Sequence, residues 1–197
     1  MGTFGGLLAG KFWLVKPASE LIKNGRLLQS PKDIEGIELT SMDGKQITKK
    51  DFLGHWSVVT FGFTSCPDVC PTAMGYYKQE LDLIANSQNS KSGVEFIFVS
   101  VDPERDTPEV LKEYLKKFHS QIKGYSGTKE QLEKVAKLLK TFHMKTGDGE
   151  DYSISHSPYF YLINPEGQWQ AFYTPPVLKG RMADDLISVI EGTKAFF

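Results

Sequence analysis

The stretch SVVTFGFTSCPDVCP, Ser57 to Pro71, joins a strand-forming run to the only two cysteines of the chain. Its first half, Ser57 to Phe63, is β-branched and aromatic, which predicts a short buried strand. Cys66 and Cys70 follow with one residue more between them than a Cys-x-x-Cys redox motif has. If a helix begins near Cys70, both sulfurs can point the same way. The spacing therefore allows a disulfide or a shared metal ion, and favours neither.

The segments after this stretch alternate between strand and helix patterns. Val94 to Val101, VEFIFVSV, is nearly continuous in apolar residues and predicts a second buried strand. Apolar residues at helical spacing between Met74 and Asn86 predict an amphipathic helix that connects the two strands as a right-handed crossover. The rest of the chain predicts, in order, a helix beginning at Thr107-Pro108, a short strand at 122–125, a helix capped by Thr128 and Gln131, an antiparallel hairpin of 158–163 with 168–173, and a last helix from about Lys179. This order indicates an α/β, thioredoxin-like fold with an N-terminal extension and an inserted helix/strand element.

Composition restricts the class of protein. The chain has 197 residues, 40% of them hydrophobic, and a formal charge of −1. This is enough for one domain with a full core, and it offers no basic excess that would attract nucleic acid or an acidic membrane surface. We interpret residues 1–30 as an N-terminal arm and residues 31–197 as the folded domain. Lys11 interrupts the weakly apolar start, so the arm is either an ordinary extension or the trailing end of a membrane anchor.

A third side chain is needed to choose between a disulfide and a shared metal ion at the two cysteines. The positive end of a helix dipole stabilises a thiolate, so we expect a lowered cysteine pKa that would favour both a nucleophile and a metal ligand. His156 lies in DYSISHSPYFYLINPEG, just before the predicted hairpin, where a thioredoxin-like fold faces the cysteine loop. Two thiolates and one imidazole suit copper. Ser157-Pro158 falls near the thioredoxin cis-proline, so a cis bond there is a further hypothesis, with an ordinary trans bond as the base expectation.

Other polar residues have simpler interpretations. His55, His119 and His143 are expected to be surface or helix-end histidines. The run Asp102 to Asp106 is expected to form a strand-end turn and a helix cap; the alternative is that Asp102 or Asp106 lies near the cysteine loop in a supporting role or forms a patch that docks a partner. Asp68, between the cysteines, could tune their pKa or contact a partner, or it could be a solvated loop carboxylate.

The segments FGFTSCPDVCP, VSVDPERDTPEVLKEYLKKF, GYSGT and DYSISHSPYFYLINPEG, in this order, resemble the Sco family of copper chaperones for cytochrome c oxidase assembly. The resemblance runs from about Gly36 to the C-terminus. It implies that Cys66, Cys70 and His156 are ligands of Cu(I) or Cu(II). It also implies a single N-terminal anchor that holds the domain at the periplasmic face of a bacterial inner membrane or in the mitochondrial intermembrane space.

The resemblance and these residues together lead to two hypotheses about function. The first is a metallochaperone that receives copper from a donor protein and passes it to the CuA site of cytochrome c oxidase subunit II. It would require a thiol reductant, because a Cys66–Cys70 disulfide and bound copper exclude each other. The second is a thiol-disulfide oxidoreductase that keeps the cysteines of such copper proteins reduced, which does not need His156. A peroxidase is not expected, because Phe63 stands where the Thr-x-x-Cys pattern requires threonine.

Overall fold

The computed structural model describes residues 17–67, 69–86, 94–147, 149 and 152–193. Eight strands form one sheet in the order β1-β10-β9-β4-β5-β6-β2-β3. Their bounds are β1 Arg26–Asp33, β2 Glu38–Ser41, β3 Gln46–Thr48, β4 Trp56–Gly62, β5 Val94–Ser100, β6 Ile122–Ser126, β9 Phe160–Ile163 and β10 Gln168–Tyr173. A separate two-stranded hairpin consists of β7 His143–Thr146 and β8 Ser153–His156.

The centre of the sheet is parallel, as the crossover pattern predicted. β4 pairs in parallel with β5, and β5 with β6, whereas β9 runs antiparallel to β4. Every residue of β4 is buried, because helices or the hairpin cover both faces of the sheet at this strand. The fully apolar runs in the sequence therefore mark the strands with two covered faces.

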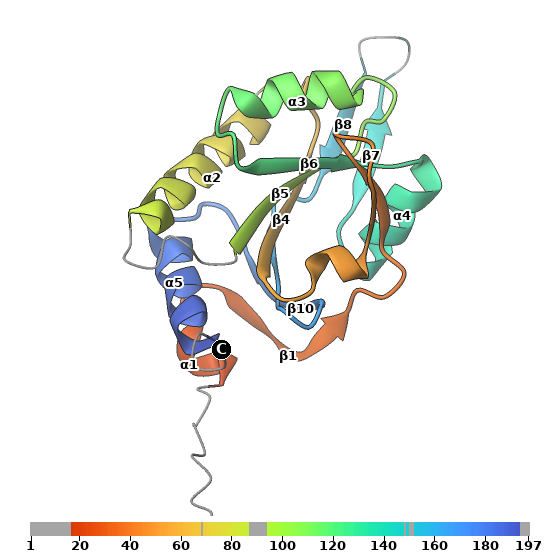
Figure 1. Cartoon of the computed structure of the whole chain (residues 1–197). Coiled ribbons are helices and arrows are strands. Elements are labelled where there is room, and N and C mark those ends of the chain that lie inside the picture. The colour runs from red at the N-terminus through yellow and green to blue at the C-terminus, as the bar shows by residue number, and fades with distance from the viewer. Residues whose placement is uncertain (1–16, 68, 87–93, 148, 150–151, 194–197) are drawn as a thin grey trace, which may run out of the picture.

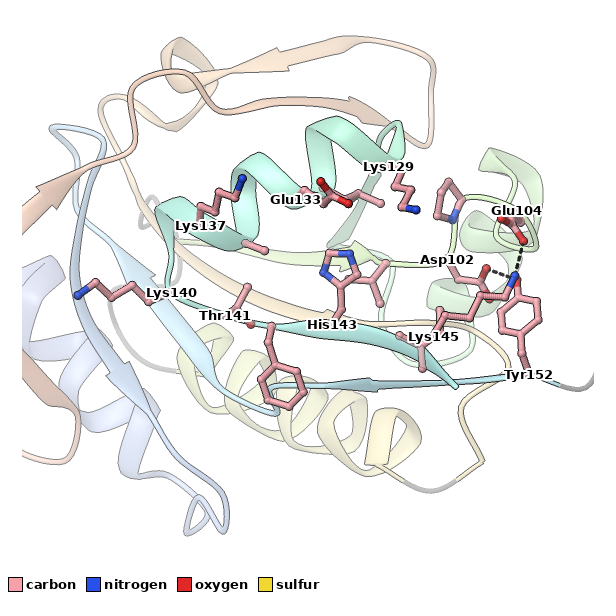
Figure 2. A pocket seen from close by; sticks show the side chains of 16 residues that line it. Asp102, Glu104, Lys129, Glu133, Lys137, Lys140, Thr141, His143, Lys145 and Tyr152 are labelled. Carbon is pink, nitrogen blue, oxygen red and sulfur yellow. Dashed lines mark hydrogen bonds and ion pairs between the residues drawn. The ribbon is translucent and has the colours of Figure 1, made fainter. Parts of the chain in front are cut away.

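Two hydrophobic clusters lie on opposite faces of the sheet, since successive strand side chains point to opposite sides. The helices α2 Val69–Ala85, α3 Pro108–Lys116 and α5 Arg181–Thr193 pack on one face. Helix α4 Lys129–Leu138 and the β7–β8 hairpin cover the other (Figure 1). Between α4 and the hairpin lies a groove, which Figure 2 shows from close by.

The predicted elements are all present, and the predicted caps are confirmed. The Thr107 side chain accepts a hydrogen bond from the Val110 amide at the start of α3, and Thr128 and Gln131 form the capping box of α4. Helix α2 begins at Val69, earlier than its apolar stripe indicated. The hairpin β7–β8 and the strands β1 to β3 were not predicted. Two short helices, α1 Ala18–Leu21 and the 3-10 turn η1 Lys49–Phe52, were not predicted either.

The N-terminal part of the described chain is attached to the domain. β1 pairs with β10 and runs across the predicted boundary between residues 30 and 31, and the division into arm and domain stays a prediction. The buried Asp185 carboxylate of α5 accepts hydrogen bonds from the amides of Lys23, Asn24 and Gly25. Among the described residues, no helix has both the length and the apolarity needed to cross a bilayer. Residues 1–16 lie outside them.

Candidate metal centre

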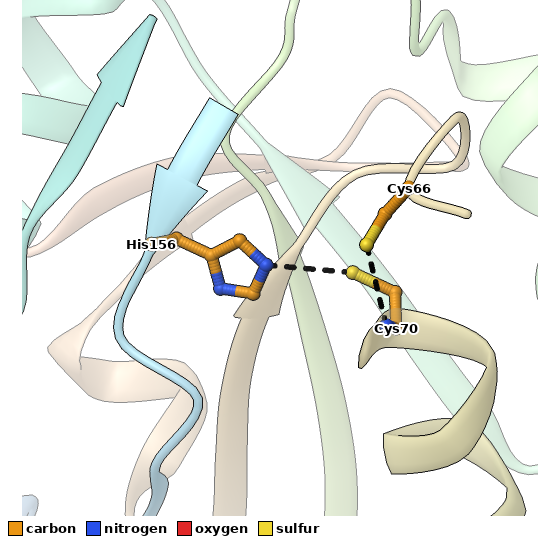
Figure 3. Close-up of side chains that lie close together, drawn as sticks. All are labelled: Cys66, Cys70 and His156. Carbon is orange, nitrogen blue, oxygen red and sulfur yellow. Dashed lines mark hydrogen bonds between the residues drawn. The ribbon is translucent and has the colours of Figure 1, made fainter. Parts of the chain in front are cut away.

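The structure brings Cys66, Cys70 and His156 together at one end of the sheet. Cys66 lies in the loop after β4, Cys70 in the first turn of α2, and His156 at the end of β8. One ligand atom from each lies within 4.8 Å of the others, and Cys70 Sγ is 3.5 Å from His156 Nε2 (Figure 3). Both cysteines are free thiols. Two segments far apart in sequence, the β4–α2 junction and the end of β8, thus place two sulfurs and one imidazole around one point.

The path of the backbone explains why the two sulfurs converge. Because α2 begins at Val69, the Cys70 amide is one of the free N–H groups of the first helical turn, and it donates to Cys66 Sγ at 3.4 Å. Gly62, at the end of β4, leaves room for Cys70. A Cβ at that position would lie 2.7 Å from Cys70 Sγ, well inside van der Waals contact. Glycine is therefore required for the close approach of strand and sulfur.

Burial controls the protonation of the site. Cys70 is 1% exposed and Cys66 9%. Removal from water raises the pKa of the Cys70 thiol, so the lowered pKa expected from the helix dipole is wrong for this residue in the metal-free protein. Burial also lowers the pKa of His156, which keeps the imidazole neutral at pH 7. A neutral imidazole is the form that binds a metal ion.

The orientation of His156 is fixed from two sides. Its Nδ1 lies 3.3 Å from the carbonyl oxygen of Ser157, which favours the proton on Nδ1 and leaves the Nε2 lone pair facing Cys70. The ring packs edge-to-face on Phe63, with ring centroids 6.0 Å apart. Pro175-Pro176 is the only cis peptide bond among the described residues. The Ser157-Pro158 bond is therefore trans, as the base expectation had it, and the cis hypothesis was wrong.

Asp106 supports the cysteine loop. It is 3% exposed, and its carboxylate accepts hydrogen bonds from the Thr64 amide at 2.9 Å and the Thr64 hydroxyl at 2.6 Å. It also accepts one from the Ser100 hydroxyl at the end of β5. Thr64 stands two residues before Cys66, so the carboxylate fixes the loop that carries the first sulfur. The alternative of a supporting role at this loop thus describes Asp106 better than a helix cap does.

Asp102 supports the strand that carries the imidazole. Its buried carboxylate accepts hydrogen bonds from Arg105 Nε and from the Tyr152 hydroxyl, each at 2.5 Å. The Arg105 guanidinium also stacks 3.7 Å above the Tyr152 ring and donates to the Tyr152 carbonyl oxygen at 3.1 Å. Tyr152 directly precedes β8, which ends at His156. The turn from Asp102 to Asp106 therefore contacts both halves of the site.

The other histidines lie elsewhere in the fold, with one exception. His55 faces Glu95, and His119 Nδ1 accepts from the Gln121 amide, both in line with surface or helix-end roles. His143 is paired directly with His156 across the β7–β8 hairpin, a proximity that was not predicted. The alternation of Tyr152, Ile154 and His156 with polar residues was the signal for β8. Asp68 lies outside the described residues.

The donor set fits a soft metal ion. Thiolate sulfur favours Cu(I), Zn(II) or iron–sulfur chemistry, whereas hard ions such as Mg²⁺ and Ca²⁺ prefer oxygen ligands. Among the residues that the structure describes, no carboxylate belongs to the cluster, and its three ligands are fewer than the four of a closed structural zinc site. Two sulfurs and one imidazole nitrogen therefore suit copper, and an open zinc site can use the same three ligands.

Comparisons with known proteins give a consistent picture. The model of the SCO1/SenC family matches residues 29–191. Protein SCO1 homolog, mitochondrial, from Homo sapiens is 34% identical over 183 residues, which cover 91% of this chain and 60% of the human protein. The chain thus spans slightly less than two thirds of the length of that relative.

Solved structures of similar proteins show the same fold. The crystal structure of Arabidopsis thaliana ScoI with copper bound has a TM-score of 0.70 at 32% identity, covering 88% of this chain and all of that one. Yeast Sco1 with copper bound has a TM-score of 0.70 at 31% identity, covering 86% of this chain and 90% of that one. The predicted thioredoxin-like α/β fold is confirmed by these similarities and by the sheet itself.

Proposed function

The chain belongs to the SCO1/SenC family, and from this premise we propose that it is a copper chaperone in the assembly of cytochrome c oxidase. Copper is its cargo, held by the sulfurs of Cys66 and Cys70 and by Nε2 of His156. The observation that carries the proposal is the convergence of these three ligand atoms within 4.8 Å of one another. Copper bound to two solved relatives supports it.

The side chains would act as follows when copper binds. The Cys70 thiol, whose pKa burial raises, gives up its proton to the solvent as the metal takes its place. His156 is already neutral and presents its Nε2 lone pair. Release requires no covalent chemistry: ligands of the acceptor replace the three protein ligands one at a time. A three-ligand site leaves an open position at which such an exchange can begin.

The partners of this exchange are a copper donor, a thiol reductant and an acceptor. The acceptor is the CuA site of cytochrome c oxidase subunit II. The reductant is needed because the two sulfurs must be thiols before copper can bind. Nucleic acid has no place in this function, in accord with a formal charge of −1.

The place of action is proposed on the same grounds. We place the folded domain, residues 31–197, at the periplasmic face of a bacterial inner membrane or in the mitochondrial intermembrane space, attached through an N-terminal anchor to which residues 1–30 lead. The mitochondrial assignment of the human relative supports the second compartment.

Thiol-disulfide exchange is the second candidate function. It is favoured by the proximity of the two thiols, whose residues share a hydrogen bond from the Cys70 amide to Cys66 Sγ. The raised pKa of Cys70 weakens this alternative, since the thiolate is the attacking species. In this function His156 would be dispensable.

Copper titration of the reduced wild-type protein and of a His156→Ala variant distinguishes the copper chaperone from the thiol-disulfide oxidoreductase. We expect the variant to lose at least about 100-fold in Cu(I) affinity, measured by competition with a chromogenic chelator, because one of three ligands is gone. His119→Ala, which removes a histidine away from the cluster, is the matched control and should bind as wild type. Retention of wild-type affinity by His156→Ala would contradict the proposed site.

A further inference from the structure

A groove of about 580 Å³ lies between α4 and the β7–β8 hairpin, beside the metal centre and separate from it (Figure 2). None of the three candidate ligands lines it. Its floor is apolar and its rim is charged, as the side chains that line it show. The floor is built from Val101, Leu132, Ala136 and Ile154, and the rim includes Lys129, Lys137, Lys140 and Lys145.

Four lysines and three carboxylates, Asp102, Glu104 and Glu133, line the groove, a net formal charge of +1. Asp102 is paired with Arg105, outside the lining. Lys145 is paired with Glu104 at 2.9 Å. The other three lysines of the rim make no ion pair with any part of the chain that the structure describes, and Figure 2 draws none for them. One of them, Lys140, lies against the amine of Lys32 and lowers its pKa. Two neighbouring ammonium groups repel each other unless an anion comes between them.

This local excess contrasts with the rest of the molecule. The chain as a whole carries a formal charge of −1, whereas the side chains that line the groove carry a net formal charge of +1. Phe142, at the mouth of the groove, is 56% exposed. An apolar floor, an exposed aromatic ring and unpaired lysines together suit a ligand with both acidic and apolar groups.

The groove is joined to the metal centre through the hairpin. His143, which lines the groove, is paired with His156 in the antiparallel register, so their side chains lie on the same face. The Ser157 amide donates to the Phe142 carbonyl oxygen at 3.1 Å, and the Ser157 hydroxyl accepts from the Phe142 amide at 3.2 Å. The mouth of the groove is thus tied to the residue next to the candidate copper ligand.

We propose that this groove docks an acidic segment of the protein with which copper is exchanged, with an apolar side chain of that segment on the floor and its carboxylates against Lys129, Lys137 and Lys140. The inference rests on the proposed function. A free anion such as phosphate does not use the apolar floor, whereas a peptide segment uses both features. A segment seated there lies along the hairpin that carries His156, and so directs the partner's own metal ligands to the copper site.

The test uses the metal-free soluble domain of cytochrome c oxidase subunit II as the probe. It is titrated into the isotopically labelled, Cu(I)-loaded protein, and amide chemical shifts map the contact. We expect shifts along α4 and β7. Lys137→Glu combined with Lys140→Glu should slow second-order copper transfer at least about tenfold at low salt, and the difference should shrink in about 0.5 M salt, as expected for charge steering.

Three controls keep the result specific. Lys116→Glu with Lys117→Glu makes the same change of charge at the opposite end of α3, away from the groove, and should transfer as wild type. Phe142→Ser should slow transfer independently of salt, because it removes an apolar contact. All variants should keep wild-type Cu(I) affinity in chelator competition, since none alters a ligand.

The outcomes separate the two proposals. Shifts that map away from the groove, or a groove variant that transfers copper at the wild-type rate in low salt, would overturn the docking inference alone. Shifts in the groove without copper transfer by the wild type would overturn the chaperone function and leave the docking site standing. If inorganic phosphate at constant ionic strength shifts the amides of the groove and the probe shifts none of them, the groove is a simple anion site, and docking is also overturned.

Discussion

Replacement of Asp106 by alanine tests whether a buried carboxylate holds the cysteine loop in place. The wild-type carboxylate accepts three hydrogen bonds, two from Thr64 and one from Ser100, and it is 3% exposed. Hydrogen bonds to a charged acceptor contribute about 1.5 to 3 kcal/mol each, and a buried amide left without an acceptor costs about 1 to 3 kcal/mol. Removal of a buried charge returns part of its desolvation cost. We therefore expect a loss of about 3 to 5 kcal/mol in the free energy of unfolding.

The Asp106→Asn variant is the matched control, because it keeps the shape of the side chain. One amide oxygen can still accept from the Thr64 amide and the Ser100 hydroxyl, while the amide nitrogen donates to the Thr64 hydroxyl oxygen. Only the charge is lost, so we expect a cost of about 1 to 2 kcal/mol. Urea denaturation of the reduced, copper-free protein measures both variants, with an unchanged m value as the sign of an intact fold.

The Cu(I) affinity of each variant should depend on how firmly the loop that carries Cys66 is held. In Asp106→Ala the loop that carries Cys66 is held less firmly, and ordering it on binding should lower the Cu(I) affinity about tenfold, or about 1.4 kcal/mol. In Asp106→Asn the affinity should stay near the wild-type value. If the alanine variant unfolds within about 0.5 kcal/mol of wild type, or if both variants lose the same amount, the carboxylate does not hold the loop by these hydrogen bonds.

Two further predictions concern the metal centre. Gly62→Ala places a methyl group 2.7 Å from Cys70 Sγ and 2.7 Å from a Phe98 ring carbon. The variant should lose about 1 to 3 kcal/mol in the free energy of unfolding, measured by urea denaturation, and should bind Cu(I) more weakly. The control Gly75→Ala, in an open position of α2, should be neutral or stabilising. The apparent Cu(I) affinity should rise at least about tenfold per pH unit between about pH 6.5 and 8, because copper must displace the proton that burial retains on Cys70. Any proton displaced from Cys66 adds to this slope, whereas His156, with its lowered pKa, is already neutral there. Chelator competition across this range measures the slope, and a flat profile would show that Cys70 is deprotonated before copper arrives.

Local patterns in the sequence were sufficient for the elements that build the fold. The apolar runs of β4 and β5, the N-caps at Thr107 and Thr128, and the turn formers of the β9–β10 hairpin each act over a few neighbouring residues. Such short-range preferences can be read without knowledge of the rest of the chain. The residues of β7 are mostly exposed and show no apolar pattern, and the alternation that runs into β8 was not recognised, so both strands were missed.

The supporting contacts of the metal centre could not be predicted in the same way. Asp106 reaches Thr64 across 42 positions of sequence, and Asp102 reaches Tyr152 across 50. The pairing of His143 with His156 depends on the register of a hairpin whose strands were not predicted. The pKa of Cys70 shows the limit most clearly. Its place at a helix N-terminus predicted a lowered value, but burial by residues from other segments raises it.

The sequence by itself therefore determined the α/β order of elements and the residue types of the site, two thiols and an imidazole, because local propensity and ligand chemistry reside in the residues themselves. The tertiary structure alone decided that the sulfurs and the imidazole nitrogen lie within 4.8 Å of one another, that burial controls their protonation, and that a groove with unpaired lysines lies beside them. These properties depend on the register of the sheet and on the packing of distant segments. Both arise only when the whole chain folds.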